Sequence, residues 1–332
     1  GLGDVYKRQG ISQSIPNSGI FNTFIGTQCG MENSSGDKNT CIGFQVMHFA
    51  RAGGLANGIK IGNSGDENTA MGSSCLHKNM DGNQNVAIGS ESLFNNLDGD
   101  SNVAIGYQSL YSNTTTDSNI AIGYQSLYSN TVSENTAIGY QCSYYNSDGA
   151  ENVAIGYKCL MGDNISDTNI NKNVAIGYSC GQFVGSNANR NVLIGYECGK
   201  AATGTSNKFT GNNNVLIGFE CGKINKSGSS NVLIGYQCAL FNTSGFSNVA
   251  IGLHSLRGNT SGSNNVAIGL QTLYSNTSGS QNVAVGPDTL SNNGIKNRNT
   301  GLGFRALQLN GASDNGGDDN VAIGFESSYH SY

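Results

Sequence analysis

Cysteine is the residue type with the most obvious chemistry in this chain, because nine thiols in 332 residues could form disulfides or bind a metal ion. Eight of the nine lie three residues after a glycine, and related segments that lack Cys have Ser, Thr or Ala there. The position therefore selects a small side chain, and Cys behaves as a small buried hydrophobe. We predict a ladder of small core residues that includes Cys142, Cys159, Cys180, Cys198, Cys221 and Cys238.

Two reactive roles remain as alternatives for these cysteines. Thiols stacked on neighbouring segments would have Cα separations suited to a disulfide, provided that the sulfurs point at each other. A tetrahedral metal site is less favoured, because it needs four converging ligands rather than a line, and the spacing Cys-x-x-Cys never occurs. We therefore expect neither a metal nor a cofactor.

The other candidate catalytic groups are scattered along the chain. The histidines fall in distant segments, at His48, His77, His254 and His330. Many aspartates fall in turn-like segments, and both the calcium-binding glycine-rich nonapeptide and the Gly-Lys-Ser/Thr phosphate signature are absent. The sequence predicts no catalytic residue, and hence a protein that is not an enzyme.

All these residues are positioned by a repeated pentapeptide, of which Asn102-Val103-Ala104-Ile105-Gly106 is one copy. Near-copies recur through almost the whole chain, mostly 17 residues apart. A unit of this length, rich in Val, Ile, Tyr, Asn, Ser and Gly, suits two short strands and two turns. It cannot bury its own apolar side chains, so neighbouring units must stack. We predict an all-β parallel β-solenoid of about seventeen 17-residue coils, continuous over residues 20–329.

The first residues differ in composition from the repeats. The segment 4–9 resembles the translation of a transposase adapter used in sequencing libraries. We therefore predict that residues 1–19 are a disordered or artefactual tail. Insertions between the copies, rich in Gly, Asn, Ser and Asp, are predicted to be loops at 50–56, 163–172, 200–211 and 311–319.

Strand alternation assigns the pentapeptide residues to two faces. We expect Val103 and Ile105 to point into the coil and Ala104 to point away from it. The alternate row is apolar in nearly every copy, which indicates that a second chain covers it; an alanine merely tolerated on an exposed strand is the alternative. This predicts a trimer face at Ala87, Ala104, Ala121, Leu193, Leu216 and Leu233, and ladders at Asn85, Asn102, Asn119, Ile88, Ile105, Ile122, Gly89, Gly106 and Gly123.

The asparagine column and the aromatic column could each be structural or could bind a ligand. The asparagine that opens each copy predicts a hydrogen-bonded amide ladder at a corner, with carbohydrate or ion binding as the less favoured role. The residue after the glycine is Tyr or Phe in most copies, such as Tyr107, Tyr124 and Tyr140. We favour packing along the stack for this aromatic row, and a glycan-binding ladder is its alternative.

Composition excludes several partners. The formal net charge of -5 gives no basic footprint for nucleic acid. No apolar run approaches the roughly 20 residues that cross a bilayer, so we expect no membrane insertion by this segment.

The repeated Asn-Val-Ala-Ile-Gly, with its following Ser or Cys and the Tyr-Ser-Asn-Thr turn, resembles the head repeats of trimeric autotransporter adhesins of the YadA type over residues 20–329. The resemblance implies a left-handed β-roll, a homotrimer, an extracellular or cell-surface location, and attachment to a host or matrix protein or glycan. The coils are longer than is common in that family. Similar repeats also occur in phage tail fibres, which implies a virion-surface shaft as the alternative.

Two further functions would each require a particular pattern of residues. A polysaccharide-acting enzyme would need acids or bases aligned on adjacent coils of one face, and the sequence shows no such set. An ice-binding solenoid would need a flat, regular Thr array, whereas the threonines beside the asparagines are scattered. The leading hypothesis is a non-enzymatic adhesive fibre segment whose loops, above all 200–211, contact the partner surface.

Overall fold

The computed structural model describes residues 5–7, 18–31, 33–48, 63–162, 170–201, 208–310 and 317–328. These residues form an all-β parallel β-solenoid of about 16 turns, and none of them is helical. The predicted all-β parallel β-solenoid is therefore confirmed, with about 16 turns where about seventeen coils were predicted. The contacts of the chain group into two compact units, unit 1 over residues 1–155 and unit 2 over residues 156–332, and the boundary falls inside one strand.

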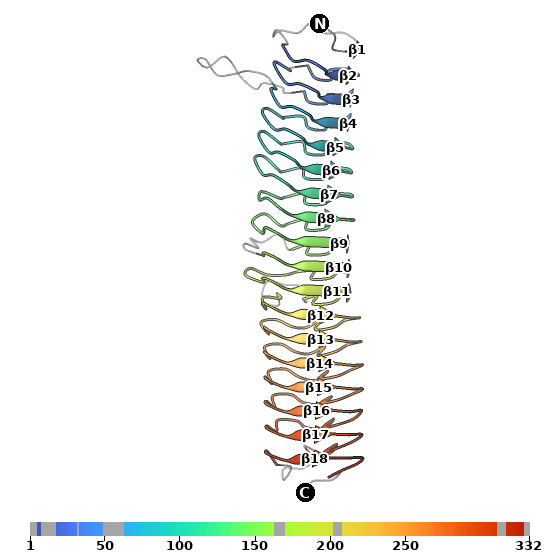
Figure 1. Ribbon diagram of the computed structural model, residues 1–332, viewed down its shortest axis with the longest axis vertical. Helices are drawn as coiled ribbons and strands as arrows, with labels where there is room; N and C mark the ends of the chain where they lie inside the picture. The colour runs from blue at the N-terminus through green and yellow to red at the C-terminus, as the bar shows by residue number, and fades with distance from the viewer. Residues whose placement is uncertain are drawn as a thin grey trace. The chain divides into compact units, whose positions relative to one another are not determined.

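Unit 1 contains one short strand per coil, and each strand pairs in parallel with the next along the chain (Figure 1). The strands are β1 (Val5–Lys7), β2 (Thr23–Ile25), β3 (Thr40–Phe44), β4 (Thr69–Ser73), β5 (Val86–Ile88), β6 (Val103–Ile105), β7 (Ile120–Ile122), β8 (Thr136–Ile138) and β9 (Val153–Tyr157), the last of which contains the boundary.

Unit 2 repeats the same arrangement. Its strands are β10 (Val174–Tyr178), β11 (Val192–Tyr196), β12 (Val215–Ile217), β13 (Val232–Ile234), β14 (Val249–Ile251), β15 (Val266–Ile268), β16 (Val283–Val285), β17 (Thr300–Leu302) and β18 (Val321–Ile323).

The register places equivalent residues of successive coils directly beside one another. In unit 1, Ala104 pairs with Ala121. In unit 2, Leu216 pairs with Leu233. Every pentapeptide position thus becomes a straight column within each unit, as the 17-residue period predicts.

The two faces of the strand are the reverse of our expectation. Ala104 and its equivalents are fully buried inside the single chain, whereas Val103 and Ile105 on the other face are half-buried. The predicted trimer face is therefore wrong, because its residues line the interior of the coil and have no surface to offer a second chain. The six residues predicted to form the trimer face all have no exposed surface: Ala87, Ala104, Ala121, Leu193, Leu216 and Leu233.

Side-chain volume explains the reversal. Inside the coil, the middle strand residue faces the residue four positions after the motif glycine, and one large side chain fills the space between them. Ala104 is matched by Leu110, whereas Leu216 is matched by Gly222, where an added Cβ would lie 2.2 Å from Leu216. A narrow core packed to normal interior density accommodates one leucine per pair but not two.

The same exchange of volume recurs in other coils. Phe24 faces Gly30, where a Cβ would meet the phenyl ring at 2.7 Å. Leu193 is matched by Gly199, with a corresponding distance of 3.0 Å. The leucines at this position in unit 2 therefore fill interior space left by small facing residues, and they do not form an exposed apolar patch.

Several predictions fall at or beyond the edges of the described residues. Strand β1 lies within the predicted tail 1–19 and pairs in parallel with β2, so at least Val5–Lys7 join the sheet of unit 1. All of loop 50–56 lies outside the described ranges, as do residues 163–169, 202–207 and 311–316 of the other three predicted loops.

Candidate functional site

The asparagine ladder is internal. Asn102 donates from Nδ2 to Oδ1 of Asn85 at 3.2 Å and to the carbonyl of Thr116 at 2.8 Å, and its backbone N–H donates to Oδ1 of Asn85 at 2.9 Å. Asn119 makes the same pair of bonds to Asn102. Because these side chains have no exposed surface, the amide ladder is confirmed and a ligand has no access to it.

A second asparagine column closes the opposite corner. Asn113 donates to Oδ1 of Asn96 at 2.9 Å, and Asn276 donates to Oδ1 of Asn259 at 2.9 Å in unit 2. All four residues are buried. Both asparagine columns therefore stabilise corners, since buried amides that lacked these partners would each cost about 1–3 kcal/mol.

The motif glycines supply a backbone conformation. Gly106 has a φ of 129°, and an added Cβ would lie 2.4 Å from the carbonyl oxygen of Gly123. The left-handed conformation also occurs at three non-glycine positions of the same coil, Gln108, Leu110 and Ser118. Residue type did not predict this conformation at the three positions, because bulky residues rarely adopt it and the geometry of the coil imposes it on them.

The cysteine column is also internal. Cys198 and Cys221 are fully buried, and their thiols donate to the carbonyls of Leu216 and Leu233, each at 3.1 Å. Burial raises the pKa of both thiols well above the ordinary value. All the described cysteines are buried and none is in a disulfide, so they lie in the coil interior as the small-residue ladder predicts.

The outer strand face is partly exposed to solvent. It consists of the Val, Ile, Thr, Met and Leu side chains that flank the buried middle residue of each strand. Ile120 is 37% exposed in unit 1 and Ile268 is 38% exposed in unit 2. The predicted ladder of Ile88, Ile105 and Ile122 is in register, but it runs along this outer face and not inside the coil. An exposed, largely apolar stripe of this kind is a candidate binding surface.

The first aromatic row comprises the rings one residue after each motif glycine. In unit 1, Tyr124 and Tyr140 stack with their centroids 5.2 Å apart. In unit 2, the stacked rings are Tyr157, Tyr178, Tyr196, Phe219 and Tyr236, with centroids 4.8–5.0 Å apart. This face-to-face stacking along the coils agrees with the packing role that we favoured.

A second aromatic row, which the sequence reasoning missed, lies five residues after the motif glycines of unit 1. Its rings stack with centroids 4.9–5.3 Å apart from His77 through Phe94, Tyr111 and Tyr128 to Tyr144. The 17-residue spacing of these rings is visible in the sequence and could have revealed the row.

Two coils of unit 2 have ion pairs at the same corner in place of rings. Nζ of Lys223 lies 2.6 Å from Glu197 and 2.5 Å from Glu220, and Nζ of Lys200 lies 2.6 Å from Glu197. Burial alone would raise the pKa of Glu197, but hydrogen bonds from the two lysines outweigh it and lower this pKa. The four charges satisfy one another, and the corner gains no unpaired catalytic group.

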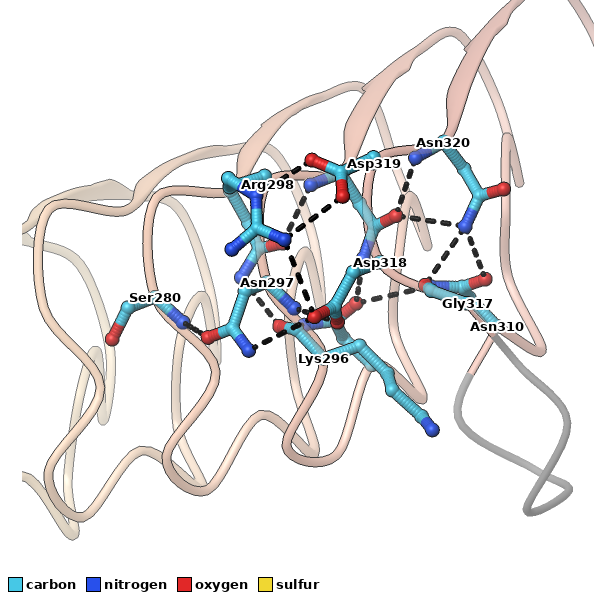
Figure 2. Close-up of polar contacts among 12 residues, drawn as sticks. Ser280, Lys296, Asn297, Arg298, Asn310, Gly317, Asp318, Asp319 and Asn320 are labelled. Atoms are coloured by element: carbon cyan, nitrogen blue, oxygen red, sulfur yellow. Dashed lines mark hydrogen bonds and ion pairs between the residues drawn. The ribbon is translucent and has the colours of Figure 1, made fainter.

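Aspartates form a column at another corner, in the turns where the sequence places them, but their hydrogen bonds to the backbone were not predicted. Oδ1 of Asp100 accepts the backbone N–H of Asn83 at 2.6 Å, and Oδ1 of Asp117 accepts that of Asp100 at 2.7 Å. Figure 2 shows the equivalent bond in unit 2, where Asn297 donates to Oδ1 of Asp318 at 2.7 Å. The carboxylates thus replace missing backbone partners at a turn, which is a structural role.

Beside this bond, Figure 2 shows a forked ion pair. Arg298 donates from Nε to Oδ1 of Asp319 at 2.6 Å and from Nη2 to Oδ2 at 2.8 Å. Asn320 donates to the carbonyl of Gly317 at 2.8 Å and continues the asparagine ladder to Asn299. The ladder therefore resumes directly after the 311–316 insertion.

The described histidines do not converge on a site. His48 and His77 have ring centroids 5.3 Å apart, while His254 lies in unit 2 and His330 lies outside the described residues. Burial, reinforced by His77, lowers the pKa of His48. Within the described ranges, no three His, Cys, Asp or Glu side chains are grouped to hold a metal ion.

No family model matches this chain, and no curated protein sequence matches it. In the part of the chain that the structure describes, no helix is long and apolar enough to span a membrane. The fold and its columns define the protein as a parallel β-solenoid repeat protein.

Proposed function

We propose that the chain is a non-enzymatic adhesive fibre segment that works as a homotrimer at a cell or virion surface, and that the outer strand face is the contact between its copies. The observation that carries this proposal is the stripe of half-exposed Val and Ile residues along the strands of each unit. Parallel strands are almost always covered on both faces, and the coil covers only one.

A second copy of the chain is the occupant that fits this face best. The stripe contains no charged side chain in the strands of unit 1 from β5 to β8 or of unit 2 from β10 to β16. Its side chains stand in straight columns with one coil spacing, so an identical stripe matches it coil for coil. The surface chemistry therefore supports the trimer, with the contact moved from the alanine row to the valine and isoleucine rows.

Attachment to a host or matrix surface is supported by the resemblance to adhesin head repeats. It is also supported by the structural roles of the thiols, amides and carboxylates, which bond within the chain. The thiols and corner amides are buried, and the corner carboxylates bind backbone N–H groups. A phage tail-fibre shaft uses the same coil and remains the second candidate. Cleavage of a glycan by the purified protein would contradict both.

Mass photometry of the wild-type chain and of an Ile105→Glu, Ile122→Glu variant tests the trimer. We expect a wild-type trimer and a variant monomer with an unchanged far-ultraviolet circular dichroism spectrum. The matched control is Thr115→Glu with Thr131→Glu, at exposed turn positions of the same coils, and should remain trimeric. A monomeric wild type, or a trimeric isoleucine variant, overturns the proposed contact.

A further inference from the structure

Three coils of unit 1 combine the first and second aromatic rows at one corner. The first row provides Tyr107, Tyr124 and Tyr140, with centroids 5.4 and 5.2 Å apart. The second row provides Tyr111, Tyr128 and Tyr144, with centroids 5.1 and 4.9 Å apart. We name these six tyrosines, together with Gln108, Gln125 and Gln141, the tyrosine strip.

The glutamines form the middle row of the strip. Gln125 donates from Nε2 to Oε1 of Gln108 at 2.8 Å, and Gln141 donates to Gln125 at 3.0 Å. In unit 2, His254 holds the equivalent position and its ring lies 5.5 Å from Tyr236 of the first row and 6.1 Å from Tyr274 of the second. The residue two positions after the glycine therefore lies between the two rows.

The way in which the rings stack decides what the strip can offer. The angle between neighbouring ring planes is 4° for Tyr111 and Tyr128, 7° for Tyr124 and Tyr140, and 25° for Tyr107 and Tyr124. The ring faces are therefore occupied by each other, and a ligand meets ring edges and phenol hydroxyls. Flat stacking of a sugar or a base on one ring, the usual aromatic mode of recognition, has no surface here.

The glutamine amides add polar groups at the same spacing. The row uses one N–H of each Nε2, and an amide nitrogen carries two. The strip thus repeats one set of hydrogen-bonding groups, two phenols and one amide, once per coil along about 5 Å steps. A periodic set of this kind matches a linear polymer whose own repeat equals the coil spacing.

Charge narrows the polymer further. The nine residues of the strip are all uncharged Tyr and Gln, whereas the equivalent corner of unit 2 contains Lys200, Lys223, Glu197 and Glu220. The surrounding unit 1 has 13 acidic and 6 basic residues, which disfavours a polyanion. The chemistry therefore fits an uncharged chain rich in hydroxyl groups.

From this geometry we propose that the tyrosine strip binds an extended, uncharged β-1,4-linked polysaccharide that lies parallel to the direction in which the coils stack, with one sugar residue per coil. Such a chain advances per residue by nearly the coil spacing. Its successive residues are turned over, so their hydroxyl groups point alternately to either side, and the two tyrosine rows flank both sides. The inference rests on the proposed attachment function and names one class of surface ligand for it.

Isothermal titration with cellohexaose tests the proposal on the full-length chain. We expect binding at least tenfold tighter than for cellobiose, since cellohexaose covers all three coils of the strip and cellobiose covers two. Maltohexaose, whose α-linked chain coils and does not follow the strip, should bind at least tenfold more weakly than cellohexaose. If cellobiose or maltohexaose binds as tightly as cellohexaose, the proposed match of one sugar residue per coil is overturned.

Removal of the phenol hydroxyls locates the site. Phe at all six tyrosine positions keeps the stacked rings and should lower the affinity for cellohexaose at least tenfold. The matched control, Tyr178→Phe with Tyr196→Phe and Tyr236→Phe in unit 2, should leave the affinity unchanged. Unchanged affinity in the six-fold variant overturns the proposal, as does a change of its oligomeric state, which would make the strip a contact between copies.

These outcomes separate the inference from the proposed function. A wild-type trimer that attaches to surfaces but does not bind cellohexaose overturns the polysaccharide site alone. A wild-type monomer that binds cellohexaose through the tyrosine strip overturns the trimer alone.

Discussion

The two units use one coil design and differ in the chemistry of a single corner. Five residues after the motif glycine, unit 1 has stacked rings such as Tyr111 and Tyr128, and unit 2 has Lys200 and Lys223 paired with glutamates. Unit 1 has a formal charge of -7, from 13 acidic and 6 basic residues, whereas unit 2 has +2, from 9 acidic and 11 basic residues. The inner columns are shared, so the coil tolerates either surface.

This difference indicates that the residue types at the corner can change without a change in the residue types of the interior columns. Glycine and asparagine positions inside each coil contact the next coil and cannot vary, while a side chain at the corner contacts mainly its equivalents above and below. Substitutions at inner positions should therefore have equal effects in both units, and substitutions at the corner should not.

The largest effect is expected at the motif glycines. Gly106→Ala in unit 1 and Gly235→Ala in unit 2 would place Cβ 2.4 and 2.3 Å from a carbonyl oxygen, at φ values of 129° and 145°. We expect each to lower the free energy of unfolding by on the order of 4 kcal/mol or more. Hydrogen exchange resolved by unit measures this, because long repeats need not unfold in two states.

Gly294→Ala is the control for the glycines. It also has a positive φ, 62°, but nothing lies within 4 Å of its added Cβ, so it should cost only about 1–2 kcal/mol. If Gly106→Ala is tolerated as well as Gly294→Ala, the close approach between coils does not determine this column.

The next effect is expected at the asparagine ladder. Asn102→Ala and Asn248→Ala each remove two hydrogen bonds that the amide donates and leave the N–H of the following asparagine without its acceptor. A loss of about 2–4 kcal/mol in either unit follows from buried groups left unpaired. Urea denaturation should show the same loss in both units, against less than about 1 kcal/mol for Thr115→Ala at an exposed turn position.

Acid should weaken unit 1 through His48, which is 6% exposed and has a lowered pKa because of burial and His77. Since the unfolded chain then binds a proton more readily, the stability from neutral His48 is present above pH 6.5 and is lost as the pH falls from 6.5 towards the lowered pKa. Thermal unfolding at pH 8 and pH 5 measures it. His48→Phe should reduce the difference and leave an aromatic ring in the row; an unchanged difference would exclude His48 as its source.

The smallest effect is expected at the charged corner of unit 2. Lys223→Met removes two ion pairs from a side chain that is 31% exposed, and solvent screening limits the loss to less than about 1 kcal/mol. The loss should shrink in 1 M salt. Tyr128→Met at the equivalent corner of unit 1 should show no dependence on salt, and a dependence of equal size in both units would remove the distinction between the corners.

The period predicted most of the fold. Glycine, asparagine and small residues recurring every 17 positions leave few arrangements other than stacked coils, and the asparagine, glycine and cysteine columns lie where their spacing places them. The second aromatic row was equally visible at Tyr111 and Tyr128. The pairing of Ala104 with Leu110 and of Leu216 with Gly222 is also visible in the sequence, but only the folded coil shows that these two positions face each other in its interior.

The repeat length alone assigns residues to columns, so these assignments could be made from the amino-acid sequence. The face of the strand that each column occupies became known only from the packing inside the folded coil. Both faces are apolar, so alternation cannot distinguish inside from outside, and the answer depends on how much volume one narrow coil can enclose. A coil that holds a single leucine opposite each alanine leaves its valines and isoleucines at the surface.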